Sequence, residues 1–238
     1  MGASPVTGLI LTGGGARAAY QVGVLKALMR IRRDCCGIGR NPFDVIAGTS
    51  AGAINAAALA CRSDDIDGAV GRLVDTWAGF HADQVYLADS LGVIRSGARW
   101  LTMLSLGWVL ARWRRARPKS MLDNSPLREL LADLVPVHRL NDMMRGGHLK
   151  ALAVSASGYC SGLHATYYYK LAGTAPWNRS QRVAVRQSIT IDHLLASSAI
   201  PFVFPAIELG LDGRREYFGD GSMRQSAPIS PAVHLGAE

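Results

Sequence analysis

The sequence predicts an α/β domain, because short apolar segments typical of buried strands are followed by a loop and a helical pattern. Residues 8–12 form a brief apolar segment that enters a glycine-rich loop, and residues 18–30 then show apolar side chains at helical spacing. Residues 43–47 form a second apolar segment, which meets the motif GTSAG and an alanine-rich stretch with strong helix propensity. Two strand–loop–helix units therefore stand near the start of the chain, joined by a predicted loop over residues 34–42.

The rest of the chain continues with helix and strand patterns. A helix is predicted over residues 65–80, and another runs through residue 134 with Ser125 as its N-cap and Pro126 at the first helical position. Two strands joined across a Gly-containing turn, a helix and a short last strand follow, over residues 149–155, 164–170, 191–199 and 216–219. Residues 228–236 resemble the start of a further βα connection, so the chain would be a short or truncated example of its fold.

Length and composition indicate one globular domain over residues 1–238. Hydrophobic residues make up 49% of the chain and charged residues 18%, which excludes a disordered chain. The formal net charge of +8 favours anionic partners, either a phospholipid surface or nucleic acid. The cysteines show neither a disulfide framework nor zinc-like spacing, so we expect a reducing compartment and no metal site.

A change in composition over residues 91–119 predicts an insertion that faces a membrane or acts as a lid. Residues 100–111 carry no charge, and arginines flank them on both sides. As a helix this stretch would be about 18 Å long, too short for a hydrocarbon core of about 30 Å. A buried helix with solvated ends is the alternative. The chain also shows no signal-peptide pattern, so we expect a cytoplasmic protein that contacts membranes peripherally.

The strongest functional signal is G-x-S-x-G at residues 48–52, placed between a predicted strand and a predicted helix. A sharp turn that lifts Ser50 clear of the sheet brings backbone segments together, which explains why Gly48 and Gly52 lack a Cβ. The following helix adds unpaired N–H groups and a positive dipole end beside the hydroxyl. Ser50 is therefore the candidate nucleophile, and a tight structural turn is the alternative.

The glycine-rich loop Gly13, Gly14 and Gly15 has two chemical interpretations. Together with Ala18 it satisfies the dinucleotide-binding pattern G-x-G-x-x-[GA], and Asp34 lies at about the distance expected for a ribose contact. However, Asp34 does not end a second apolar strand. The other interpretation is an oxyanion hole, in which backbone N–H groups face the negative charge of an ester intermediate. We favour the oxyanion hole because it complements Ser50, and a tight turn in a βα unit remains the alternative.

A serine nucleophile needs a base, and three side chains are candidates. His193 lies within a helical pattern and is expected at the surface or in a cap. His234 would complete the order Ser…Asp…His of an α/β-hydrolase, but the elbow of such enzymes usually follows several strands. Asp220 ends a predicted strand and precedes a glycine, where a partly desolvated carboxylate can accept the serine proton directly.

Four motifs in the same order resemble the patatin-like phospholipase family. They are GGGAR at 13–17, GTSAG at 48–52, ASSAIP with FP at 196–205, and DGS at 220–222. The resemblance spans nearly the whole chain. It implies a three-layer α/β/α sandwich with a central, mostly parallel sheet. It also implies a Ser50–Asp220 dyad, an oxyanion hole at Gly13, Gly14 and Gly15, and no metal or cofactor. Ala18 and Ser222 depart from the family pattern, and Arg17 is expected to brace the loop or meet an anionic headgroup.

The resemblance implies a lipid acyl hydrolase that cleaves esters of phospholipids or lysophospholipids through an acyl-enzyme. Its expected partners are the lipid substrate and an anionic membrane surface, without nucleic acid. Three other interpretations stay open at this point: a Ser-His-Asp hydrolase that uses His234, a dinucleotide-binding module, and a non-catalytic membrane- or nucleic-acid-binding protein that relies on the arginine-rich stretch.

Overall fold

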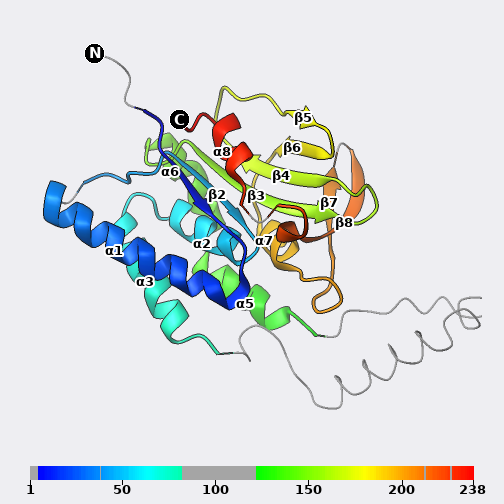
Figure 1. The fold of residues 1–238 in the computed structure, drawn as a ribbon, viewed down its shortest axis with the longest axis horizontal. Helices are drawn as coiled ribbons and strands as arrows, with labels where there is room; N and C mark the ends of the chain where they lie inside the picture. The colour runs from blue at the N-terminus through cyan, green and yellow to red at the C-terminus, as the bar shows by residue number, and fades with distance from the viewer. Residues whose placement is uncertain (1–4, 38, 82–121, 212, 226) are drawn as a thin grey trace, which may run out of the picture.

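The computed structural model describes residues 5–37, 39–81, 122–211, 213–225 and 227–238. Within these residues, eight strands form one sheet (Figure 1). Its main path runs through β1 (Gly8–Leu11), β2 (Val45–Thr49), β3 (Ala151–Gly158), β4 (His164–Tyr169), β6 (Arg182–Arg186) and β5 (Asn178–Arg179). Off this path, β8 (Arg214–Asp220) pairs with β3, and β7 (Ile207–Leu211) pairs with β8. Strands β1, β2 and β3 are parallel, as are β4 and β6.

The register along β3 places the end of β8 beside the end of β2. Strand β2 pairs with β3 as far as Thr49 opposite Ser155. Strand β8 pairs antiparallel with β3 from the next position, where Asp220 lies opposite Ala156. Because β4 occupies the other edge of β3, β2 and β8 share one edge in succession. Thr49 and Asp220 therefore end their strands next to each other.

Helices cover both faces of the sheet. They are α1 (Ala18–Cys36), α2 (Ala51–Ala60), α3 (Ile66–Ala78), α5 (Ser125–Leu134), α6 (Leu140–Arg145), α7 (Ile191–Ser198) and α8 (Ile229–His234), with short 3₁₀ turns at Gly15–Arg17, Val137–Arg139 and Gly221–Met223. Successive strand residues face opposite sides. Ile46 and Leu152 thus join a core with α1, α2, α3, α5 and α7, while Val45 and Ala151 pack toward α8. The predicted α/β/α sandwich is confirmed.

Most predicted elements are present, with shifted ends. The second strand runs over Val45–Thr49 rather than 43–47, and the strand predicted at 149–155 extends to Gly158. The first helix continues to Cys36, so the predicted loop from residue 34 was wrong at its start. Helical i→i−4 bonds outweigh the weak glycine signal there, and Gly37 ends the helix at a φ of 73°.

One local prediction was wrong, and another was right in one of its two alternatives. Ser125 is the first helical residue and not the N-cap of α5, because its N–H and hydroxyl both donate to Asp123 Oδ1. For His193 the expected cap is confirmed, because it takes part in the capping box of α7, whereas the surface position is not, because the residue is buried. Strands β5, β6 and β7 were not predicted. The predicted insertion at 91–119 lies outside the described residues.

Candidate active site

Ser50 occupies a sharp, strained turn between β2 and α2. It is a non-glycine residue with φ 55° and ψ −132°, a conformation that usually costs about 1–3 kcal/mol. The flanking glycines allow it. A Cβ on Gly48 would lie 2.5 Å from Gly52 O, and one on Gly52 would lie 2.4 Å from Leu11 O. The steric reason predicted for both glycines of the elbow is therefore present in the structure.

The carboxylate of Asp220 lies within hydrogen-bond distance of the Ser50 hydroxyl. Ser50 Oγ donates to Asp220 Oδ2 at 2.7 Å, across 170 positions of sequence. The other carboxylate oxygen, Oδ1, accepts from the Ser222 N–H at 2.7 Å, and the Asp220 N–H donates to Ala199 O at 2.9 Å. Both side chains are buried, with 5% of Ser50 and 6% of Asp220 exposed. The structure thus brings the predicted nucleophile and base together in a largely desolvated contact.

The glycine loop packs directly against this pair. A Cβ on Gly13 would lie 3.2 Å from Ser50 Cβ and 1.9 Å from Ser222 Oγ, so a larger residue here would force the Ser222 side chain to move. Gly15 adopts a φ of 56°, in the left-handed region that favours glycine. Within the described part of the chain, no hydrogen bond uses the N–H of Gly14 or Gly15. These two N–H groups are therefore available to a ligand beside Ser50.

A buried hydroxyl on α7 contacts the backbone of the elbow. Ser197 Oγ accepts from the Ser50 N–H at 2.8 Å and donates to Ser155 O at 2.6 Å. The Ser50 N–H is therefore already bonded inside the protein. Sequence reasoning noted Ser197 only as part of a motif and assigned it no role.

An apolar pocket of about 150 Å³ opens beside Ser50. Its walls come from α2, α3, α5, the glycine loop and the segment after α7; they are Gly15, Ala16, Ser50, Ala51, Ile54, Thr76, Trp77, Phe80, Leu127, Leu130, Leu131, Leu134, Ser198, Ile200 and Phe204. Buried Asn55 holds one wall in place, because its Oδ1 accepts from Trp77 Nε1 at 3.0 Å and its Nδ2 donates to Ala18 O. Sequence reasoning missed this pocket and Asn55, since lining residues from separate helices leave no local motif.

Neither candidate histidine contacts Ser50. The His193 ring accepts from the Thr190 N–H at the start of α7 and packs edge-on against Tyr167. Burial lowers the pKa of His193 to about 4. His234 lies on α8 and stacks on Trp177. Ala232 of the same helix packs against Gly8, at the start of β1. Ser50 follows the other end of these parallel strands, so His234 lies away from the hydroxyl.

The remaining sequence candidates lie around the site or outside it. Asp34 is in the last turns of α1 and pairs with Arg30, so it does not end a strand as a dinucleotide fold requires. Arg17 is exposed, and its guanidinium makes no hydrogen bond or ion pair within the described residues, so bracing of the loop finds no support. Ala18 is fully buried under the loop.

Comparison with known proteins identifies the family. The patatin-like phospholipase family matches residues 9–233. No match was found among curated proteins. The crystal structure of VipD from Legionella pneumophila superposes with a TM-score of 0.50 at 16% identity, over 93% of this chain and 46% of that one. The SpcU–ExoU complex from the type III secretion system of Pseudomonas aeruginosa gives a TM-score of 0.38 at 16% identity, over 69% of this chain and 34% of the matched chain.

This chain therefore spans less than half the length of either solved chain. The VipD superposition supports the fold, and the family match covers nearly the whole sequence. The chain belongs to the patatin-like phospholipase family.

Proposed function

We propose that the protein is a lipid acyl hydrolase that cleaves carboxylic esters of phospholipids or lysophospholipids through Ser50 and Asp220. The observation that carries this proposal is the 2.7 Å contact between Ser50 Oγ and Asp220 Oδ2 beside an apolar pocket. The family match supports lipid as the substrate class.

The proposed reaction has two half-reactions. Ser50 Oγ attacks the ester carbonyl carbon while Asp220 Oδ2 takes the hydroxyl proton, and the Gly14 and Gly15 N–H groups stabilise the developing oxyanion. Asp220 then returns the proton to the leaving alcohol, which departs as the C–O bond breaks. In the second half, Asp220 deprotonates a water that attacks the acyl-enzyme, and the proton passes to Ser50 as the fatty acid leaves.

The pocket supports an acyl chain as the group held during this reaction. Its walls are almost entirely apolar, and Ser50 is one of the lining residues. The pocket has a volume of about 150 Å³. Sites that hold drug-sized ligands are larger, at about 300–1,000 Å³. The described walls would therefore hold the part of the acyl chain next to the ester, with the headgroup outside.

Active-site labelling and turnover test the proposal. A fluorophosphonate should label the wild type at Ser50, and Ser50→Ala should abolish labelling and phospholipid hydrolysis. Asp220→Asn should lose activity by several orders of magnitude, because an amide keeps the shape but cannot accept the proton. His234→Ala is the matched control and should keep substantial activity. An inactive but folded His234→Ala protein, or an active Ser50→Ala protein, would contradict the dyad.

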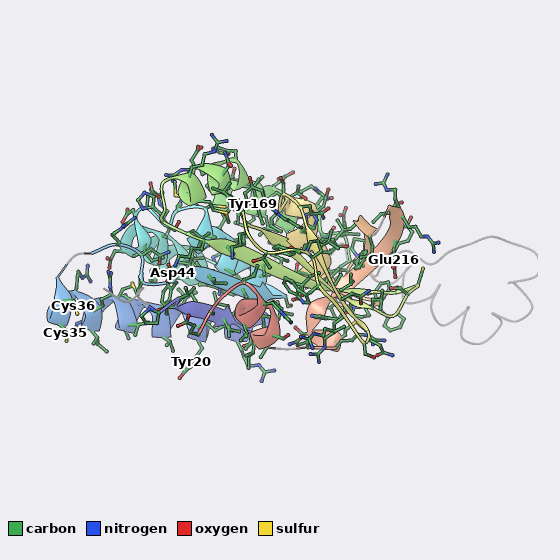
Figure 2. The ribbon with its side chains drawn as sticks, turned by 90° about the horizontal axis from the view of Figure 1, so that it is seen from above. Tyr20, Cys35, Cys36, Asp44, Tyr169 and Glu216 are labelled. Atoms are coloured by element: carbon green, nitrogen blue, oxygen red, sulfur yellow. The ribbon has the colours of Figure 1, made fainter. Side chains whose placement is uncertain are left out.

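An anionic membrane surface is the partner that we propose, and the described residues offer one face for it. Helix α1 exposes an apolar stripe, defined as Tyr20, Val24, Leu28 and Ile31, with exposed fractions of 42–77%. Figure 2 shows Tyr20 pointing away from the body of the protein. Lys26 and Arg30 are exposed on the same helix, and Asp34 is its only acidic residue. Aromatic and basic side chains of this kind suit a membrane interface.

Among the described residues, no helix has both the length and the hydrophobicity needed to cross a bilayer.

Vesicle co-sedimentation separates this face from the arginine-rich segment that the sequence indicates. Replacing Tyr20, Val24 and Ile31 together with serine should weaken binding to anionic vesicles at both low and high salt. Replacing the arginines of the segment with glutamine should weaken binding mainly at low salt; they are Arg112, Arg114, Arg115 and Arg117. Ile229→Ser with Val233→Ser is the control, since these α8 residues are 57% and 59% exposed. Unchanged binding by the first two variants would reject a membrane role for both regions.

A further inference from the structure

The end of helix α7 contacts both members of the proposed dyad. Ser197, in its last turn, binds the backbone of Ser50 through its side chain. Ala199, the residue after the helix, accepts from the Asp220 N–H at 2.9 Å. These two contacts lie two positions apart, at the end of α7 and on the residue that follows it, whereas Ser50 and Asp220 are 170 positions apart in sequence. One short segment at the end of α7 therefore contacts the backbones of both residues.

The direction of the Ser197 hydrogen bonds follows from their partners. Ser155 O is a carbonyl and can only accept, so the Ser197 hydroxyl proton points toward β3 at 2.6 Å. A lone pair of the same oxygen then faces the Ser50 N–H at 2.8 Å. Ser197 and Ser155 are both fully buried. An apolar side chain at position 197 would leave the Ser50 N–H without this partner and would remove the bond to the Ser155 carbonyl.

The bonded atom is the backbone nitrogen of a strained residue. Ser50 holds φ 55° only because the surrounding structure imposes it. A turn of the peptide at this nitrogen would swing Ser50 Oγ away from Asp220 Oδ2. The hydrogen bond from Ser197 therefore acts on the orientation of the nucleophile, while its link to Ser155 anchors the bond to β3.

We infer that Ser197 is a positioning residue that holds the backbone of Ser50 so that its hydroxyl faces Asp220. A second consequence concerns the oxyanion. Because the Ser50 N–H is committed to Ser197, stabilisation of the intermediate falls to other donors, among them the N–H groups of the glycine loop. This inference rests on the proposed hydrolase function, and it assigns a role to a hydroxyl that does not touch the substrate.

The test compares Ser197→Ala with Ser63→Ala. Ser63 is also fully buried, but its Oγ has no hydrogen-bond partner in the described part of the chain, so the control deletes a buried hydroxyl without breaking a bond. Turnover of a soluble p-nitrophenyl ester and the rate of fluorophosphonate labelling are measured well below each melting temperature. We expect Ser197→Ala to lower kcat and the labelling rate by roughly 10- to 100-fold with KM nearly unchanged, the effect of an unpaired buried donor. Ser63→Ala should stay within about twofold, since it unpairs no buried group.

Ser197→Thr and Ser197→Cys keep the inference testable if the alanine variant does not fold. Threonine retains the hydroxyl and should recover most of the activity, whereas the weak acceptor sulfur of cysteine should recover little. A folded Ser197→Ala protein with kcat within threefold of wild type would overturn the inference. So would variants whose kcat follows their melting temperatures rather than the presence of the hydroxyl. A wild type that is neither labelled nor active would instead reject the proposed function.

Discussion

The close approach at Gly52 gives a sharp test of how the elbow and the glycine loop are held together. A Cβ at this position would lie 2.4 Å from both Leu11 O and Thr12 O, whereas ordinary contact begins at 3.4 Å. Both are backbone atoms directly before the glycine loop, so no side chain can rotate away. Gly52→Ala must therefore push α2 and the loop apart by about 1 Å, and a misplacement of that size in catalytic geometry can lower the rate roughly 100-fold.

The same substitution should cost little stability. Overpacking typically costs about 1–3 kcal/mol. Alanine recovers about 1 kcal/mol of helix propensity relative to glycine. The net loss is then at most about 2 kcal/mol, which would lower the melting temperature of a domain of this size by no more than about 8 °C, at about 2–4 °C per kcal/mol. The variant should therefore remain folded and lose most of its activity.

Gly71→Ala in α3 is the matched control, because a Cβ there meets nothing within 4 Å. It should keep full activity and gain up to about 1 kcal/mol from helix propensity. Fluorophosphonate labelling and p-nitrophenyl ester turnover measure the activity, and circular dichroism measures the melting temperature. A Gly52→Ala protein with wild-type melting and activity within threefold would refute the claim that backbone contact sets the elbow against the loop.

Three further predictions concern the buried polar groups and the pocket. Burial lowers the pKa of both His164 and His193 to about 4. Between pH 6.5 and pH 4 these two histidines are therefore protonated in the unfolded chain, where their pKa is about 6.5, but not in the folded chain. The free energy of unfolding should therefore be highest above pH 6.5 and should fall between pH 6.5 and pH 4, by up to about 3 kcal/mol per histidine. His164→Leu should remove about half of that pH dependence in urea unfolding, and unchanged curves would contradict the assignment. Ile54→Phe should shift ester preference toward shorter acyl chains by narrowing the pocket, whereas Val233→Phe on the exposed face of α8 should not; equal chain-length profiles would place the acyl chain elsewhere. Asn55→Leu breaks the bond to Trp77 and should raise KM for long-chain esters more than it lowers kcat, measured against the same substrates.

The elbow and the glycine loop could be predicted from sequence because their causes are local. Ser50 needs small neighbours within two positions on either side, and a strand followed by a helix is visible in the same short window. Asp220 was harder. Its neighbours show only a carboxylate before a glycine at a strand end, and the contact with Ser50 arises because β8 takes over the edge of β3 where β2 stops. No pattern within either segment encodes that exchange, so the order of the family motifs was needed to pair them.

The residues that sequence reasoning missed share a different cause. Ser197 and Asn55 are polar side chains whose partners depend on how one helix packs against another element, and a buried serine or asparagine looks ordinary in its own helix. The glycines explain why this matters at the site. A Cβ on Gly52 or Gly221 would meet backbone atoms of another segment at 2.4 Å, so the segments touch there without intervening side chains. Where backbones meet so closely, few side chains can reach between them to fix their orientation. Ser197 is one that does, since its hydroxyl connects Ser50 to Ser155 at this junction.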